Sequence, residues 1–126
     1  MSYTVKNLRS TKDSAPDFGV SDVQEAHFAG AELGAESTGV TLHVIRPGGR
    51  QRGHHHDRAE EIYVVLAGSG KVKLDDEIVE LSRLDAIRVA PKVKRAFEAG
   101  PDGLELLAFG PVHEADGEIL GEGFWD

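Results

Sequence analysis

Three consecutive histidines, His54, His55 and His56, are the residues whose types and spacing most clearly permit chemistry. In an extended strand, successive side chains point to opposite faces at a rise of about 3.3 Å per residue. His54 and His56 therefore share a face, with backbones about 6.6 Å apart, while His55 points the other way. From that spacing two imidazole nitrogens can bind one ion at about 2.0–2.2 Å each. Glu61 follows after a short turn and can add a carboxylate ligand.

The ligand types indicate which ion would bind. Two neutral imidazoles and one carboxylate, with further positions left open, suit zinc, iron(II), manganese or nickel. The pattern therefore predicts a divalent transition metal as cofactor, held by His54, His56 and Glu61. A second interpretation stays open, in which the histidines are a polar stretch at a strand edge or bind metal only adventitiously. Glu61 favours the first, because it opens an apolar, strand-like run.

Short runs rich in β-branched residues surround the histidines and must position them. Strands are predicted at residues 41–46, 61–66, 71–74, 78–81, 86–89 and 104–109. Asp75-Asp76 predicts a tight hairpin, whereas Gly68-Ser69-Gly70 and Gly100-Pro101 predict breaks between strands. Six or more short antiparallel strands predict an all-β sandwich or barrel. Only one helical turn is expected, at residues 21–25.

With 126 residues and 13.6 kDa, the chain is expected to form one domain. Residues 1–36 are expected to be loops and peripheral strands, including one around Ala26-His27-Phe28. Residues 37–110 are expected to form the barrel. Residues 111–126 are expected to be an irregular acidic tail whose Phe124 and Trp125 pack on it.

The charge distribution limits the partners. The formal net charge is −8, and all 14 basic residues lie at or before Arg95, whereas eight of the 22 acidic residues follow it. This balance argues against nucleic acid and membrane surfaces as partners. The acidic end is expected to be a solvated face, or alternatively to dock on a basic partner.

Composition also limits the chemistry and the location. The absence of cysteine excludes disulfides, thiolate metal sites and thiol nucleophiles. No apolar run is long enough to span a membrane, and the first residues do not look like an export signal. A cytoplasmic protein is therefore expected.

The histidine segment resembles a known motif. His54-x-His56, four residues, Glu61, six residues and Gly68 match the first signature motif of the cupins, and the resemblance extends from about Gly39 to Gly110. It implies an antiparallel double-stranded β-helix (jelly roll), commonly homodimeric, with a divalent metal held by two histidines, the glutamate and a further histidine. The family includes oxygenases, isomerases, decarboxylases and non-catalytic binders, so the fold does not define the function.

The second motif of the family departs from its usual residues in this chain. The family pattern places Leu84 at one glycine, Ala90-Pro91-Lys92 at Pro-x-Gly, and Arg95 at the fourth metal-binding histidine. Two outcomes follow. Arg95 pairs with Glu61 or Glu60 in a metal-free pocket, or the metal stays and Arg95 holds an anionic ligand beside it.

Further residues are candidates for binding the ligand. Tyr63 shares a face with Glu61, and His43, in the preceding strand, is the best substitute for the missing fourth metal ligand. Several arginines crowd the approach to the histidines and either attract an anion or pair with the acidic end: Arg46, Arg50, Arg52 and Arg58. The ligand-binding set is therefore predicted to be Arg95, Tyr63, Arg52 and His43.

These observations support one leading function and two alternatives. The leading hypothesis is a metal-dependent cupin, an oxygenase or isomerase, acting on a small oxygenated anionic metabolite. The first alternative is a non-catalytic binding or sensing module in which Arg95 replaces the metal. The second is an accessory subunit whose acidic tail engages a basic partner. A homodimer is expected because small barrels cover exposed sheet edges by self-association.

Overall fold

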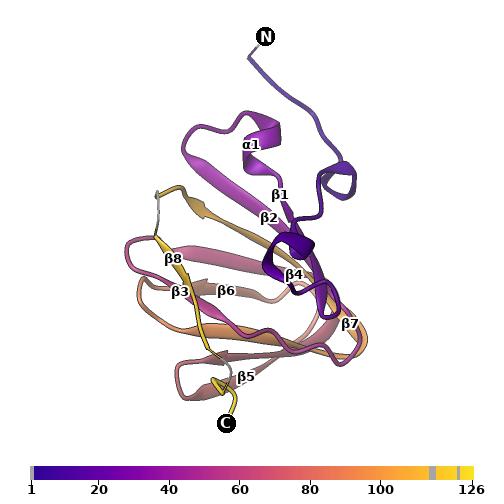
Figure 1. Ribbon diagram of the computed structural model, residues 1–126, viewed down its shortest axis with the longest axis vertical. Helices are drawn as coiled ribbons and strands as arrows, with labels where there is room; N and C mark the ends of the chain where they lie inside the picture. The colour runs from indigo at the N-terminus through magenta and orange to yellow at the C-terminus, as the bar shows by residue number, and fades with distance from the viewer. Residues whose placement is uncertain (1, 114–115, 122) are drawn as a thin grey trace.

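In the computed structural model, which describes residues 2–113, 116–121 and 123–126, the chain is a curled antiparallel β-sheet (Figure 1). Three short helical turns precede or join the first strands: Leu8–Ser10, Ala15–Phe18 and α1 (Gly30–Leu33). The strands are β1 (Gln24–Phe28), β2 (Thr38–Ile45), β3 (His54–His56), β4 (Glu61–Leu74), β5 (Glu77–Leu81), β6 (Ala86–Val89), β7 (Arg95–Pro111) and β8 (Gly117–Ile119).

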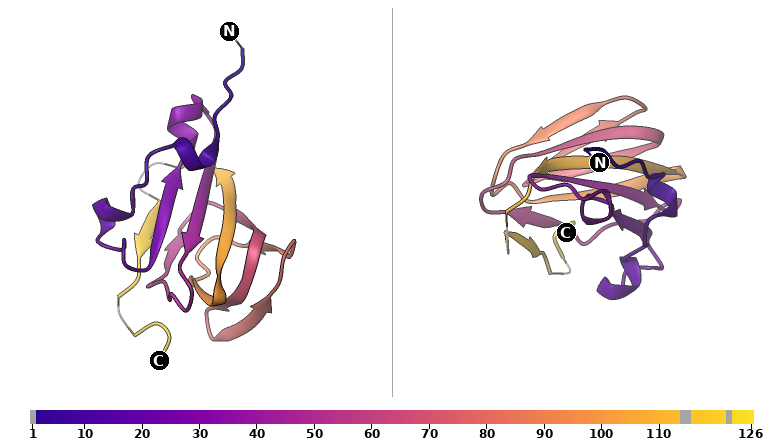
Figure 2. Two further views of the ribbon diagram at one scale, coloured as in Figure 1. Left: turned by 90° about the vertical axis from the view of Figure 1, so that its right-hand side faces the viewer. Right: turned by 90° about the horizontal axis from the view of Figure 1, so that it is seen from above.

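The strand pairing closes much of the sheet on itself. One path runs β1-β2-β7-β3-β8, and β4 pairs with β5, β6 and β7, so that the long strand β7 joins both parts. The view from above shows this curl (Figure 2). The arrangement confirms the predicted all-β, antiparallel jelly roll. Among the described residues, no helix is long and apolar enough to cross a membrane.

Several boundaries differ from the predicted ones. The predicted strands at 61–66 and 71–74 are one strand, β4, with register shifts between Val65 and Ala67 and between Gly68 and Gly70. Gly68 (φ +76°) lies in this bulge. A residue with a side chain would clash there, because a Cβ would lie 2.0 Å from Gly103 O. β7 likewise continues through Gly100-Pro101. The hairpin at Asp75-Asp76 joins β4 to β5 as predicted.

The chain ends differ from prediction in two places. Residues 21–23 form a turn that leads directly into β1, where a helical turn was predicted at residues 21–25. Helix α1 was not predicted from the sequence. The C-terminal segment is less irregular than predicted, because β8 pairs with β3. Trp125 Nε1 donates a hydrogen bond to Gln51 O at 2.7 Å, and the Arg50 guanidinium lies 4.7 Å from the Trp125 ring centre.

The inward-facing side chains divide the barrel into a packed end and an open end. Along β4, Tyr63 and Val65 are in the core, whereas Glu61 lines a cavity. Along β2, Ile45 is in the core and His43 lines the same cavity. Phe97, Val65 and Val89 are buried, while Leu107 and Phe109 are half-buried. The packed core therefore fixes the positions of β2 and β4, which carry His43 and Glu61 toward the cavity.

Candidate metal centre

The histidine strand β3 is held close to β7 by a glycine. Gly53 has φ +94°, and a Cβ there would lie 2.6 Å from Arg95 O. This close approach makes His54 the direct register partner of Arg95. On its other side, β3 pairs with β8, with His54 opposite Ile119 and His56 opposite Gly117. Both neighbours of β3 therefore come from later parts of the chain.

The three predicted metal ligands converge and form a triad, His54, His56 and Glu61. His54, His56 and Glu61 each offer a ligand atom, and these atoms lie within 4.8 Å of one another. Glu61 Oε1 is 3.4 Å from the Nε2 atom of each histidine. Two ligands bound tetrahedrally at about 2.1 Å from one ion are about 3.4 Å apart, whereas charge-assisted hydrogen bonds are about 2.7–2.9 Å long. The spacing therefore fits a shared ion better than a direct ion pair.

The neighbouring residues face elsewhere, as strand alternation predicts. His55 points away from the triad, with Nδ1 3.5 Å from Asp57 and Nε2 3.4 Å from Glu118. Glu60 pairs with Arg88 at 2.6 Å. Strand alternation therefore turns His55 and Glu60 away from the face that carries His54, His56 and Glu61.

The protonation states favoured by the surroundings are those a metal requires. Burial, together with the charge of Arg95, lowers the pKa of the His54 imidazole and keeps it neutral. Burial alone would raise the pKa of Glu61, but its contacts with His54, His56 and the Tyr63 hydroxyl lower it below its usual range. Neutral imidazole and ionised carboxylate are the metal-binding forms. The donor set therefore fits a divalent transition metal.

Tyr63 is a buried hydrogen-bond partner of Glu61. Its ring is buried against Phe97, with ring centres 4.8 Å apart, and its hydroxyl donates a hydrogen bond to Glu61 Oε1. Burial and the Glu61 charge raise the pKa of the phenol well above its usual value. Tyr63 thus remains a neutral donor that orients the carboxylate.

Arg95, at the family's fourth ligand position, is fully buried. Nη1 donates a hydrogen bond to Val93 O at 2.9 Å, and Nη2 lies 3.7 Å from Glu61 Oε1. Its Nε and Nη2 atoms have no hydrogen-bond partner among the described residues. Arg95 is therefore close to Glu61 but does not form the tight fork that guanidinium and carboxylate groups adopt when they pair directly.

Asp116 was not singled out by the sequence, yet it joins the site. Its side chain is 3% exposed and accepts hydrogen bonds from the backbone N–H groups of Arg58 and Ala59, each at 2.9 Å. One of its oxygens lies 3.6 Å from His56 Nδ1. It therefore fixes the turn between β3 and β4 and faces the outer nitrogen of His56. No sequence pattern distinguishes Asp116 from the other acidic residues of the C-terminal segment.

A cavity of about 780 Å³ opens beside the triad. Two of the predicted ligand-binding residues, His43 and Arg52, line this cavity. Arg95 and Tyr63 are not among the described residues that line it, because both side chains are buried in the core behind Glu61. The wall also carries apolar side chains: Phe18, Val20, Val23, Phe28, Phe109 and Val112. A ligand of moderate size can reach the triad from this side.

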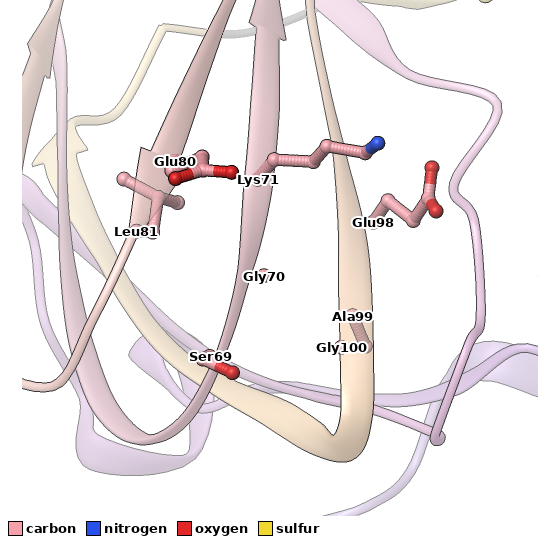
Figure 3. A pocket seen from close by; sticks show the side chains of 8 residues that line it. All are labelled: Ser69, Gly70, Lys71, Glu80, Leu81, Glu98, Ala99 and Gly100. Carbon is pink, nitrogen blue, oxygen red and sulfur yellow. The ribbon is translucent and has the colours of Figure 1, made fainter.

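A second hollow lies elsewhere on the sheet. It measures about 390 Å³ and spans β4, β5 and β7, where Lys71 and Glu98 extend from neighbouring strands (Figure 3). None of the triad residues lines it. The chemistry predicted from the sequence therefore belongs to the larger cavity.

The arginines around the histidines differ in their roles. Arg50 pairs with Glu98 at 2.8 Å, and Arg58 lies 3.5 Å from Asp116. Arg46 donates hydrogen bonds to Ser21 O. The contacts of Arg50 and Arg58 follow the alternative in which arginines pair with the acidic end of the chain, whereas Arg46 bonds to a backbone carbonyl near the start of the chain. Arg50 and Arg52 both line the cavity, and Arg50 does so while paired with Glu98.

A family model described as the cupin domain matches residues 41–109, more than half of the chain. The chain belongs to the cupin family. It is 34% identical over 80 residues to the uncharacterized protein MJ1618 of Methanocaldococcus jannaschii, a match that covers 61% of this chain and 64% of that relative. The matched region thus spans less than two thirds of the relative's length.

Solved structures of other proteins share the fold. The polyketide cyclase RemF from Streptomyces resistomycificus has a TM-score of 0.77 at 20% identity, covering 97% of this chain and 89% of that one. A sugar phosphate isomerase of the cupin superfamily from Silicibacter pomeroyi has a TM-score of 0.73 at 17% identity, covering 87% and 76%. At these identities the likeness concerns the fold alone.

The altered second cupin motif contains two left-handed residues that are not glycine. Leu84 and Lys92, which the resemblance places at the two glycine positions, have φ values of +70° and +75°. Left-handed conformations favour glycine because a side chain there is sterically strained. Leu84 and Lys92 of this cupin therefore adopt a backbone conformation that glycine adopts without strain.

Proposed function

We propose that this cupin binds a divalent transition metal through His54, His56 and Glu61 and acts on a small oxygenated, anionic molecule in the adjoining cavity. The observation that carries the proposal is the position of Glu61 Oε1, 3.4 Å from both histidine Nε2 atoms. A metal bound there would act as a Lewis acid toward a ligand oxygen. Arg52, on the cavity wall, supplies a positive charge for an anionic group.

The residues around the centre have distinct tasks in this proposal. Tyr63 holds the Glu61 carboxylate, and Asp116 holds the turn that follows His56. Arg95 lies behind Glu61, where its charge favours an anion near the metal. Oxygenase and isomerase chemistry both fit such a centre. Oxygen uptake during turnover separates these two reactions.

The alternative function, a binding module in which Arg95 replaces the metal, is supported by the burial of Arg95 beside Glu61. A replacing guanidinium would be expected to make two short hydrogen bonds to the carboxylate. The 3.7 Å separation, and the lack of a hydrogen-bond partner for Nε and Nη2 in the described part of the chain, favour the metal-binding function over this alternative.

Metal content tests the proposal. The untagged protein is stripped with a chelator, reloaded in turn with zinc, iron(II), manganese and nickel, and analysed by elemental mass spectrometry. We expect about one ion per chain for the wild type and far less for His54→Ala and Glu61→Ala. His55→Ala is the matched control, since this neighbouring histidine points away from the triad. Equal metal in all four proteins would refute the site.

The homodimer is also a proposal. Among the described strands, several have a neighbour on one side only, including β5, where Ile78 and Val79 are 54% and 41% exposed. Self-association would cover such an edge. Light scattering is expected to report twice the chain mass, and a 13.6 kDa particle at micromolar concentration would contradict the dimer.

A further inference from the structure

A chain of hydrogen bonds joins β7 to His43. The backbone N–H of Phe97 donates to Gln51 Oε1 at 3.2 Å, which fixes the orientation of that amide, since an N–H can only donate. Gln51 must then present its NH₂ group to Gln24, and Nε2 donates to Gln24 Oε1 at 2.8 Å. The first two members of the chain are thus oriented by a backbone group.

The next link determines the tautomer of His43. With its oxygen occupied, Gln24 presents Nε2 to His43 Nδ1 at 2.9 Å, and the same nitrogen lies 3.2 Å from Glu25 O, as expected of a donor. Because an amide NH₂ does not accept a hydrogen bond, His43 Nδ1 must be the acceptor. The proton of the neutral imidazole therefore sits on Nε2.

His43 is held neutral at this position. Burial lowers the pKa of its imidazole to about 4, with a further contribution from nearby His54. A protonated ring would also place a donor on Nδ1 against the Gln24 NH₂ group. Among the described residues, His43 Nε2 has no hydrogen-bond partner, and His43 lines the same cavity as the triad.

This tautomer conflicts with a role as fourth metal ligand. Coordination through Nε2 needs a lone pair there, which would move the proton to Nδ1 and set it against the donating amide of Gln24. Within the part of the chain that the structure describes, the group of residues able to hold an ion comprises His54, His56 and Glu61. The histidine considered a substitute ligand on sequence grounds is thus better suited to donate a hydrogen bond.

We propose that His43 is a specificity-determining residue whose Nε2–H, fixed by the Phe97–Gln51–Gln24 chain, donates to a carboxylate or carbonyl oxygen of the ligand. The proposal deepens the proposed function and depends on the cavity being its binding site, although the tautomer does not. At the mouth, Phe18 and Phe28 pack edge to face at 5.8 Å, with 51% and 46% of each exposed. The ligand class is therefore an oxygen-bearing head with an apolar body, for which benzoate is a suitable probe.

Nitrogen NMR tests the tautomer in the metal-free protein. Long-range proton–nitrogen spectra of the ¹⁵N-histidine-labelled wild type should show His43 as the Nε2–H form. Gln24→Glu places an acceptor opposite Nδ1 and should convert it to the Nδ1–H form, whereas Gln24→Met, which removes the donor without adding an acceptor, should give a mixture. An Nδ1–H form in the wild type overturns the proposal.

Benzoate binding to the zinc-loaded protein tests the role in recognition. His43→Met removes the donor and should weaken benzoate about ten- to hundredfold, the loss of a hydrogen bond to a charged acceptor. His43→Gln keeps an N–H donor and should restore most of the affinity. Equal affinities, or no benzoate binding to the wild type, overturn the ligand assignment. Zinc content unaffected by His54→Ala refutes the metal centre instead and leaves the NMR result standing.

Discussion

Asp116 Oδ2 lies 3.6 Å from His56 Nδ1, while the other nitrogen of the same ring faces Glu61. A carboxylate at the outer nitrogen of a metal-binding histidine keeps the proton on that nitrogen and leaves the inner one free for the metal. The backbone N–H groups of Arg58 and Ala59 outweigh burial and lower the pKa of Asp116, which keeps it ionised.

Asp116→Ala should therefore weaken metal binding about ten- to hundredfold. It should also destabilise the fold by about 1–3 kcal/mol, because two backbone donors lose their acceptor. Metal titration and urea denaturation measure the two effects. Glu118→Ala, which removes the carboxylate beside the outward-facing His55, is the matched control and should leave both nearly unchanged.

Arg95→His should increase metal affinity. It removes a positive charge close to Glu61 and introduces an imidazole at the position where cupins carry their fourth ligand. At an effective dielectric constant near 20, a like charge a few ångströms from the ion costs more than 1.4 kcal/mol, so the gain should be at least about tenfold. Competition with a chelating dye measures it. Arg95→Met separates the loss of charge from the added ligand, and a metal affinity below wild type in both variants would contradict the prediction.

Leu84→Gly should stabilise the protein by up to about 1 kcal/mol. The left-handed conformation costs a leucine about 1–2 kcal/mol, part of which glycine returns through the greater freedom of the unfolded chain. Little packing is lost, since Leu84 is 64% exposed. Guanidinium denaturation gives the difference. Leu84→Ala retains a Cβ and should show no comparable gain; a destabilising glycine would mean that the strain is absent.

His27 should make stability depend on pH. Its Nδ1 and Nε2 face Thr11 O and Glu25 Oε1, each at 2.9 Å, so both nitrogens are satisfied only when protonated. Burial lowers the pKa of His27, but the contacts with Glu25 and Thr11 outweigh it, and the pKa is raised. The folded state then binds the proton more tightly than the unfolded one.

The stabilisation by His27 should be complete below its unfolded pKa of about 6.5 and lost as the pH rises through the raised folded value. The difference in unfolding free energy between the wild type and His27→Gln, measured in urea at several pH values, should therefore shrink with rising pH. In Glu25→Gln, where burial dominates, the NMR titration of His27 should move to lower pH. A difference that grows with pH would show that the imidazole is neutral.

Much of the site followed from local pattern. The alternation of a strand placed His54 and His56 on one face and His55 on the other, and the β-branched runs marked most of the strands. What the sequence could not show depends on contacts between distant segments. Gly68-Ser69-Gly70 looks the same whether it ends a strand or forms a bulge, and only the proximity of Gly103 O decides between them.

The supporting residues have no local signature for the same reason. Asp116 is one acid in an acidic segment, and Gln24 and Gln51 are ordinary polar residues until the fold brings them together beside His43. The family pattern aligned Arg95 with the fourth ligand position, but it did not predict that the guanidinium would stop 3.7 Å short of Glu61 without a tight pair. Sequence spacing does not define distances on that scale.

The pairing of β3 has a consequence for how the protein matures. Its neighbours are Arg95 on one side and Gly117–Ile119 on the other, both of which follow the histidines in the chain. During synthesis, the imidazoles leave the ribosome long before the segments that flank them. Metal uptake by the nascent chain would therefore be a late event, and a polypeptide stalled before β8 would carry its histidines on an unsupported edge.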